Sequence, residues 1–305
     1  LLATLTYTLY GGLRASIFTD NIQMIVIVVL LLISFSYISS FTGNEFSFKF
    51  IQKNNPQLLS ASYIPSYTSG LTFFIAVAAT NLFHQGNWQR VYAAKNYETL
   101  KKSLIISFFI IVPIVFFMGF IGMVSFSIDA TNRPDLGFFT LLLKEQKESL
   151  SLIIIILGLA LTISTVDTLV NAISSLFVID GKATFKFKFK ADYLKLSKYF
   201  IVFLSLITFF IASKGFDILY LFLLADLFCC AAVLTIFYSF YDKNIEEKNA
   251  YISIIIGLSV GLLLFPSPDF SKSILVGILF PVDFFPSFVS NSLLFLSFIT
   301  ATFFP

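Results

Sequence analysis

Residues 103–126 read SLIISFFIIVPIVFFMGFIGMVSF, a run of 24 residues without a charged side chain. The hydrocarbon core of a bilayer is about 30 Å thick, and a crossing helix needs roughly 20 consecutive apolar residues. A strand of a membrane β-barrel alternates between apolar and polar residues, and this run does not. The stretch therefore predicts a transmembrane helix.

The composition of the whole chain extends this prediction to an all-α, polytopic membrane protein. Of its 305 residues, 57% are hydrophobic and only 12% are charged, whereas a soluble domain carries about 25% charged residues. The net charge of +3 is small and scattered, so nucleic acid is not an expected partner. The adjacent Cys229 and Cys230 have the wrong geometry for a bridge within a helix. A secreted disulfide scaffold and a disordered protein are thereby excluded.

Lys and Arg placement predicts the orientation of the chain in the membrane. Arg14 and the loops at 89–102, 182–198 and 242–248 together hold 13 of the 20 Lys and Arg residues. The positive-inside rule places that side in the cytoplasm, so the first span runs outward. In all, we expect about eight transmembrane helices, at residues 10–38, 69–88, 103–126, 150–179, 199–212, 216–240, 251–265 and 288–305.

Polar residues inside these spans carry the functional signal, because such groups are costly in lipid. The first group lies near the start of the chain, where Thr19-Asp20 and Gln23 follow a Gly-Gly pair. One interpretation places Asp20 at a helix entrance, where the acid faces the positive end of the helix dipole. The other gives it a functional role inside the membrane.

The second group lies at residues 81–90, which read NLFHQGNWQR. Asn81 and Gln85 are four residues apart, as are His84 and Trp88, so each pair is expected to share a helix face. Gly86 favours irregular backbone, which the membrane tolerates only beside a cavity. His84 is the only histidine, so it forms no metal site by itself. A substrate-lining segment is favoured over polar helix packing, with Asn81, His84, Gln85, Trp88 and Gln89 as its candidates.

The third group lies in the fourth span. Adjacent Ser164 and Thr165 offer two hydroxyl oxygens to a small hard cation, but hydroxyls bonded to their own helix explain the pattern equally well. Positions 164, 168, 171 and 175 form one helical stripe, which must face other helices or water. Further polar residues of this span are Asp167, Thr168, Asn171 and Ser175, and Asp226 is an isolated acid of the sixth span.

Together these groups resemble the sodium:solute symporter family. The family pattern Gly-Gly-x-x-Ala-x-x-x-Thr-Asp-x-x-Gln is matched at residues 11–23, Gln-Arg-x-x-Ala-Ala-Lys at 89–95, and the Ser-Thr-x-Asp run at 164–180. The matches cover most of residues 1–180. The short end of the second span is similar to the branch that includes urea permeases.

The resemblance implies a single transmembrane domain over 1–305 with a partial five-plus-five inverted-repeat fold of the leucine-transporter type. The chain is then expected to begin near the fifth core helix, which agrees with an outward first span. Leu1 and Pro305 both lie in apolar runs, so we expect an internal piece of a longer protein, truncated at both ends.

The resemblance also implies site residues. It assigns part of a sodium site to the Leu161 carbonyl and to the Ser164 and Thr165 hydroxyls, and it places Asp20 along the sodium exit path. It puts the segment with Asn81, His84 and Gln85 at the inner gate, with His84 in place of a family aromatic.

The resulting hypothesis is sodium-coupled symport of a small organic solute by alternating access across the plasma membrane. Sodium is the only metal and the coupling ion, no cofactor is expected, and the partners are the solute, sodium and the bilayer. Alternatives are a proton-coupled symporter, with His84 or Asp226 as carrier, and a transporter-like sensor module. A channel is disfavoured because the polar residues cluster at one depth, and an enzyme because no span carries paired carboxylates.

Overall fold

The computed structural model describes residues 2–129, 136–144, 148–181, 193–242, 245–268, 270, 273 and 292–305. Within these ranges the chain is helical almost throughout, and the only β-type pairing is an isolated bridge between Pro266 and Ser273. Six of the described helices are long and apolar enough to cross a membrane. The protein is therefore an all-α polytopic membrane protein, which confirms the prediction from composition. The basic loop at 182–190, part of the orientation argument, lies outside the described residues.

Two of the eight predicted spans differ from the structure. The span at 69–88 is broken, because α3 (Ile64–Phe83) ends before His84 and α4 (Gln85–Ala93) begins directly after it. The span at 288–305 contains α14 (Leu293–Phe303), an apolar helix of 11 residues, and residues 288–291 are not described. The other six predicted spans coincide with the six described helices that are long and apolar enough to cross a membrane. The polar segment around His84 interrupts the helix where the sequence pattern alone suggests one continuous run.

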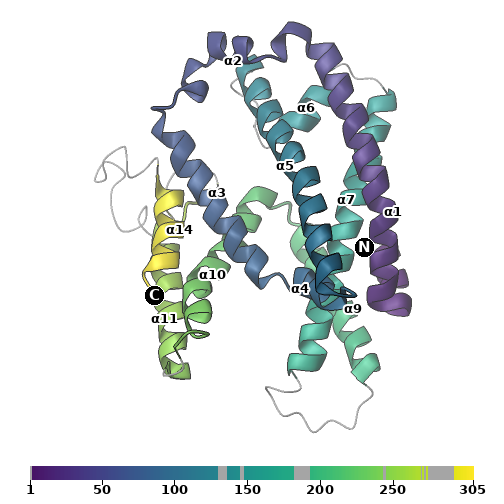
Figure 1. Cartoon of the computed structure of the whole chain (residues 1–305), viewed down its shortest axis with the longest axis vertical. Coiled ribbons are helices and arrows are strands. Elements are labelled where there is room, and N and C mark those ends of the chain that lie inside the picture. Colours follow the sequence, from purple (N-terminus) through teal and green to yellow (C-terminus); the bar gives the residue numbers. More distant parts are fainter. Residues whose placement is uncertain are drawn as a thin grey trace. The chain divides into compact units, whose positions relative to one another are not determined.

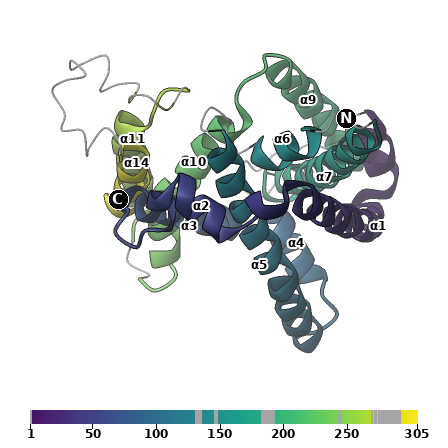
Figure 2. The ribbon, with the colours of Figure 1, turned by 90° about the horizontal axis from the view of Figure 1, so that it is seen from above.

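The chain divides into two compact units, and the first comprises residues 1–59 and 85–213. In this unit, α1 and α7 pack side by side, as Figures 1 and 2 both show. Its helices are α1 (Leu2–Thr42), α2 (Phe48–Asn54), α4, α5 (Tyr97–Ile128), α6 (Gly137–Leu143), α7 (Glu148–Ser175) with a π-helical extension (Leu176–Asp180), and α9 (Tyr193–Ala212), with short 3-10 turns at Gly43–Glu45 and Pro56–Leu59.

An apolar core holds α1, α2, α5, α6 and α7 together in the first unit. Ile38, Ile51, Ile121 and Leu142 are fully buried in it, and close van der Waals packing of this kind is what holds helices together in a bilayer. The ring centroids of Phe46 and Phe120 lie 4.9 Å apart in an edge-on contact. This core leaves the earlier part of α1, near Asp20, free for polar contacts with α7.

The second unit comprises residues 60–84 and 214–305 and contains α3, α10 (Ile218–Tyr238), α11 (Glu247–Leu264) and α14. Small residues bring its helices close together, as is common in membranes. A Cβ placed at Gly261 of α11 would lie 2.7 Å from the Cβ of Ala301 in α14. The Ser297 hydroxyl donates a 2.7 Å hydrogen bond to the Gly261 carbonyl. The single-domain and inverted-repeat assignments stay predictions.

Candidate functional site

A polar network joins α1, α4 and α7 of the first unit. Asp20 of α1 accepts a 2.7 Å hydrogen bond from the Ser164 hydroxyl of α7 and forms an ion pair with Arg90 of α4. The Arg90 guanidinium also donates to the Thr168 hydroxyl at 2.8 Å and to the Gly86 carbonyl at 3.1 Å. One carboxylate therefore links a predicted sodium ligand to the helix that carries three of the predicted substrate residues, Gln85, Trp88 and Gln89.

A second acid, Asp167, lies on α7 about one helical turn after Ser164. Asp167 is fully buried and accepts hydrogen bonds from the Thr19 hydroxyl at 3.3 Å and from the Asn171 amide at 2.8 Å. Ser164 and Asp167 are three residues apart on α7 and therefore share a face. Thr19 of α1 contacts Asp167, and Asp20, the next residue, contacts Ser164. These two contacts set the register between the helices.

The position of Asp20 overturns one of its two interpretations. Because α1 begins at Leu2 and continues through the Gly-Gly pair without a break, Asp20 lies about five turns into the helix. The dipole at a helix entrance falls off within the first turn, so the prediction of a helix entrance at Asp20 is wrong.

The three predicted sodium ligands lie together on α7. The Thr165 hydroxyl donates to the Leu161 carbonyl at 2.9 Å, and both residues are exposed, while half-buried Ser164 donates to Asp20. The described residues contain no group of three or more His, Cys, Asp and Glu that could hold a metal. The oxygens present at this point of α7 are hydroxyl and carbonyl oxygens, which suit a hard cation such as sodium. Their assignment as ligands stays a prediction.

Three positions of the predicted stripe on α7 bond to neighbouring helices. Besides Ser164 and Thr168, Ser175 accepts a 2.5 Å hydrogen bond from the Gln89 amide of α4. This confirms that the stripe faces other helices. The sequence reasoning did not select Arg90 as a site residue, although an arginine directly after Gln89, at the end of a predicted span, is a recognisable signal.

The predicted substrate residues are divided by the break at His84. Asn81 lies on α3 and donates to the Val77 carbonyl at 2.8 Å, whereas Gln85, Trp88 and Gln89 lie on α4. Because the helix is interrupted at His84, Asn81 and Gln85 do not share one helix face, and neither do His84 and Trp88. That prediction is wrong, and the substrate-lining role of all five residues stays a prediction.

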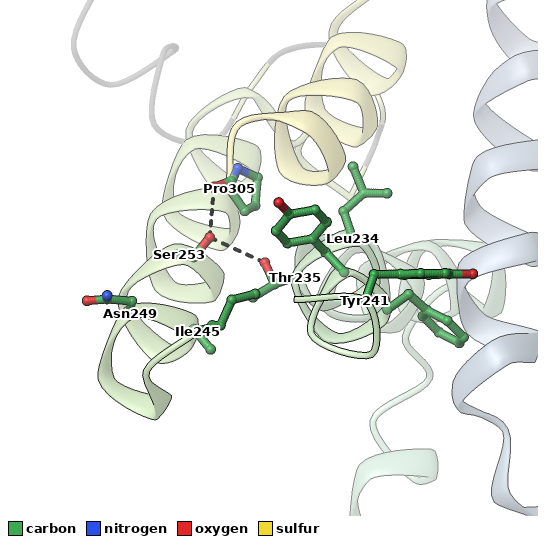
Figure 3. Close-up of a pocket in the computed structure, with 10 residues that line it drawn as sticks. Leu234, Thr235, Tyr241, Ile245, Asn249, Ser253 and Pro305 are labelled. Carbon is green, nitrogen blue, oxygen red and sulfur yellow. Dashed lines mark hydrogen bonds between the residues drawn. The ribbon is translucent and has the colours of Figure 1, made fainter. Parts of the chain in front are cut away.

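The second unit contains two further features. Asp226 of α10 is buried and accepts a 2.5 Å hydrogen bond from the Thr80 hydroxyl of α3. Separately, a cavity of about 530 Å³ lies where α10 ends and α11 begins. Figure 3 shows Ser253 in its wall, bonded to Thr235 and to the Pro305 carbonyl. This largely apolar cavity includes no residue predicted as a site from the sequence.

Two known membrane transporters are similar to this chain in sequence. The chain is 26% identical over 242 residues to the spermidine transporter DUR31 of Candida albicans, which covers 78% of the chain and 44% of that protein. It is 23% identical over 309 residues to the human sodium/glucose cotransporter 4, which covers 86% of the chain and 45% of that protein. The chain thus spans about half the length of these relatives. No solved structure matches it.

Both relatives are transporters and not enzymes. The similarity to the urea-permease branch stays a prediction. Residues 1–257, most of the chain, match the family model of the sodium:solute symporter family. The chain therefore belongs to the sodium:solute symporter family of membrane transporters.

Proposed function

We propose that this chain forms part of a sodium-coupled symporter that carries a small organic solute by alternating access across the plasma membrane. The observation that carries the proposal is the position of Asp20, which bonds to Ser164 on α7 and to Arg90 on α4. Family membership supports solute transport, and the named cargo of the two relatives, spermidine and glucose, suggests a small hydrophilic solute.

The hydrogen-bond directions suit a cation at α7. A hydroxyl has one proton and two lone pairs, and both the Ser164 and the Thr165 protons point to other acceptors, Asp20 and the Leu161 carbonyl. The lone pairs of both hydroxyl oxygens remain for sodium. The Leu161 carbonyl accepts both the Thr165 hydroxyl and, within the helix, the Thr165 amide, so the Thr165 hydroxyl must turn away before this carbonyl can serve as the third ligand. The Asp20 carboxylate adds negative charge next to these neutral ligands.

Arg90 connects ion binding to the substrate segment. Sodium near Ser164 competes with the Arg90 guanidinium for the Asp20 carboxylate, because both are cations. Weaker pairing of Arg90 loosens α4, which bears Gln85, Trp88 and Gln89, from α1 and α7. Sodium binding and solute binding are then coupled through one ion pair, and an inward membrane potential contributes ~2.3 kcal/mol per charge per 100 mV.

The test is the double variant Ser164→Ala with Thr165→Ala, in the longest natural protein that contains this chain, reconstituted in vesicles. We expect sodium-stimulated uptake to disappear, because two of three proposed ligand oxygens are removed. Uptake is measured with and without a sodium gradient over spermidine, glucose, urea, amino acids and small carboxylates.

Thr162→Ala is the matched control for this double variant. Thr162 is an exposed hydroxyl residue on the same helix, and it donates only to the Gly158 carbonyl, at 2.7 Å. Its removal should leave sodium stimulation unchanged. Sodium dependence that survives in the double variant rules out this sodium site.

A further inference from the structure

The second unit contains a buried carboxylate, that of Asp226, which is not part of the polar network of α1, α4 and α7. Asp226 lies in the middle of α10 with only 1% of its surface exposed. Its Oδ1 accepts the hydrogen bond from Thr80, and its Oδ2 is buried with no hydrogen-bond partner among the described residues. A buried acid with half of its acceptor capacity unused needs a physical explanation.

Among the described residues, the helices packed around Asp226 bring no cationic side chain close to it. Ala76 and Ala79 of α3 pack against Leu227 and Cys230 of α10, and the Cys230 thiol lies 3.8 Å from the Ile75 carbonyl. The described helices α3, α10 and α14 contain no Lys or Arg. The other ionisable residues of the packed helices and their caps are Tyr63, Tyr67 and His84 for α3, Asp217, Tyr220, Cys229, Cys230 and Tyr238 for α10, and Glu246, Glu247, Lys248 and Tyr251 for α11.

Lys248 is too far along its helix to pair with Asp226. Gly261 of α11 packs against Leu227, the neighbour of Asp226. Lys248 lies 13 positions before Gly261 on the same helix, which at 1.5 Å per residue is about 20 Å. Among the described residues, the helix faces packed beside Asp226 present apolar and thiol side chains and the Thr80 hydroxyl.

We propose that Asp226 is a proton-binding site, and that it carries a proton while α3 and α10 are packed as described. An ionised carboxylate removed from water costs several kcal/mol unless it is paired, and Thr80 supplies a single hydrogen bond. A hard metal cation takes several oxygen ligands, whereas among the described residues only the Thr80 hydroxyl bonds to this carboxylate. A proton needs only the carboxylate oxygen, so it is the cation that fits.

This proton site deepens the proposed function, since it adds a second coupling ion to the same transporter. The step is a simple protonation: the carboxylate takes one proton from water on one side of the membrane and becomes a neutral carboxyl group. Separation of Thr80 from Asp226 and admission of water stabilise the ionised form, which then releases the proton. The α3–α10 contact thus links proton occupancy to helix movement.

Difference infrared spectroscopy tests the protonation directly, on the longest natural protein that contains the chain. The expected result is a carboxyl C=O band at neutral pH that shifts in heavy water and disappears in Asp226→Asn. Asp217→Asn is the matched control, because Asp217 caps the same helix through a 3.1 Å bond from the Tyr220 amide and asparagine caps equally well. It should retain the band. A spectrum without a protonated band assignable to Asp226 at neutral pH overturns the proposal.

Transport measurements then separate this proposal from the proposed function. In Asp226→Asn, the ratio of solute uptake at acid and neutral pH should fall to about one, with sodium stimulation intact. A pH effect that persists in this variant overturns proton coupling through Asp226. If the carboxyl band is present but sodium does not stimulate uptake, the proton site is supported and only the proposed sodium coupling is ruled out. Asp226→Glu, which keeps a carboxyl group and shifts the band, supplies the assignment if the asparagine variant fails to fold.

Discussion

Replacing Asp20 by asparagine should lower sodium-stimulated uptake by about 10- to 100-fold, which corresponds to ~1.4–2.7 kcal/mol. The change removes the charge that balances Arg90 and weakens the acceptor of the Ser164 proton. Breaking a fully buried ion pair costs about 3–5 kcal/mol, and this one costs less because the Arg90 and Asp20 side chains are 36% and 19% exposed. Uptake at graded sodium concentrations should show a raised sodium requirement.

A double-mutant cycle identifies the ion pair as the cause. Asp20→Asn together with Arg90→Gln should be less harmful than the sum of the two single changes, because neither charge is then left without its partner. Glu45→Gln is the matched control, since Glu45 forms an exposed ion pair with Lys144 at 3.7 Å, and exposed pairs contribute about 0–1 kcal/mol. Strictly additive effects of Asp20→Asn and Arg90→Gln rule out coupling through this pair.

Gly261→Leu should prevent α11 and α14 from packing and reduce the yield of folded protein severely. A Cβ at this position lies 2.7 Å from the Ala301 Cβ and 3.3 Å from both the Leu227 side chain and the Ser297 carbonyl. The helices must move apart, which breaks the bond from Ser297 to the Gly261 carbonyl. Overpacking costs about 1–3 kcal/mol in a tight core. The measurement is the melting temperature by size-exclusion chromatography in detergent.

Gly70→Leu provides the matched control for the packing prediction. Gly70 lies on α3 in the same unit, and a Cβ there meets nothing within 4 Å. Leucine favours a helix over glycine by ~0.8 kcal/mol, so this variant should melt at an equal or slightly higher temperature. If both leucine variants melt alike, close packing at Gly261 does not hold α11 against α14.

Sequence alone determined the features that depend on local spacing. Uncharged runs such as residues 103–126 are long enough to cross a bilayer, and their length predicted the spanning helix α5. The 3.6-residue period placed Ser164, Thr168 and Ser175 on one face of α7, and the structure directs all three to neighbouring helices. A period is a property of neighbouring residues, so it can be read without a fold.

Local patterns failed where two local tendencies compete. The run from residue 69 to Phe83 is largely apolar and Trp88 closes the predicted span, so residues 69–88 resemble one helix, yet the backbone breaks at His84. The polar side chains that follow it stabilise a separate short helix through contacts with α7. The prediction of a helix entrance at Asp20 was wrong because the two glycines before it, which usually interrupt a helix, remain helical inside α1.

Tertiary structure alone decided the partners. Asp20 meets Ser164 across 144 positions and Arg90 across 70, and Thr80 meets Asp226 across 146. No periodicity connects residues so far apart, because their contact depends on which helices pack and in what register. The sequence by itself determined that scarce polar groups lie inside apolar helices. Packing determined that Asp20 is paired with a cation whereas Asp226 is buried beside apolar side chains, and this difference separates an ion-pair network from a proton site.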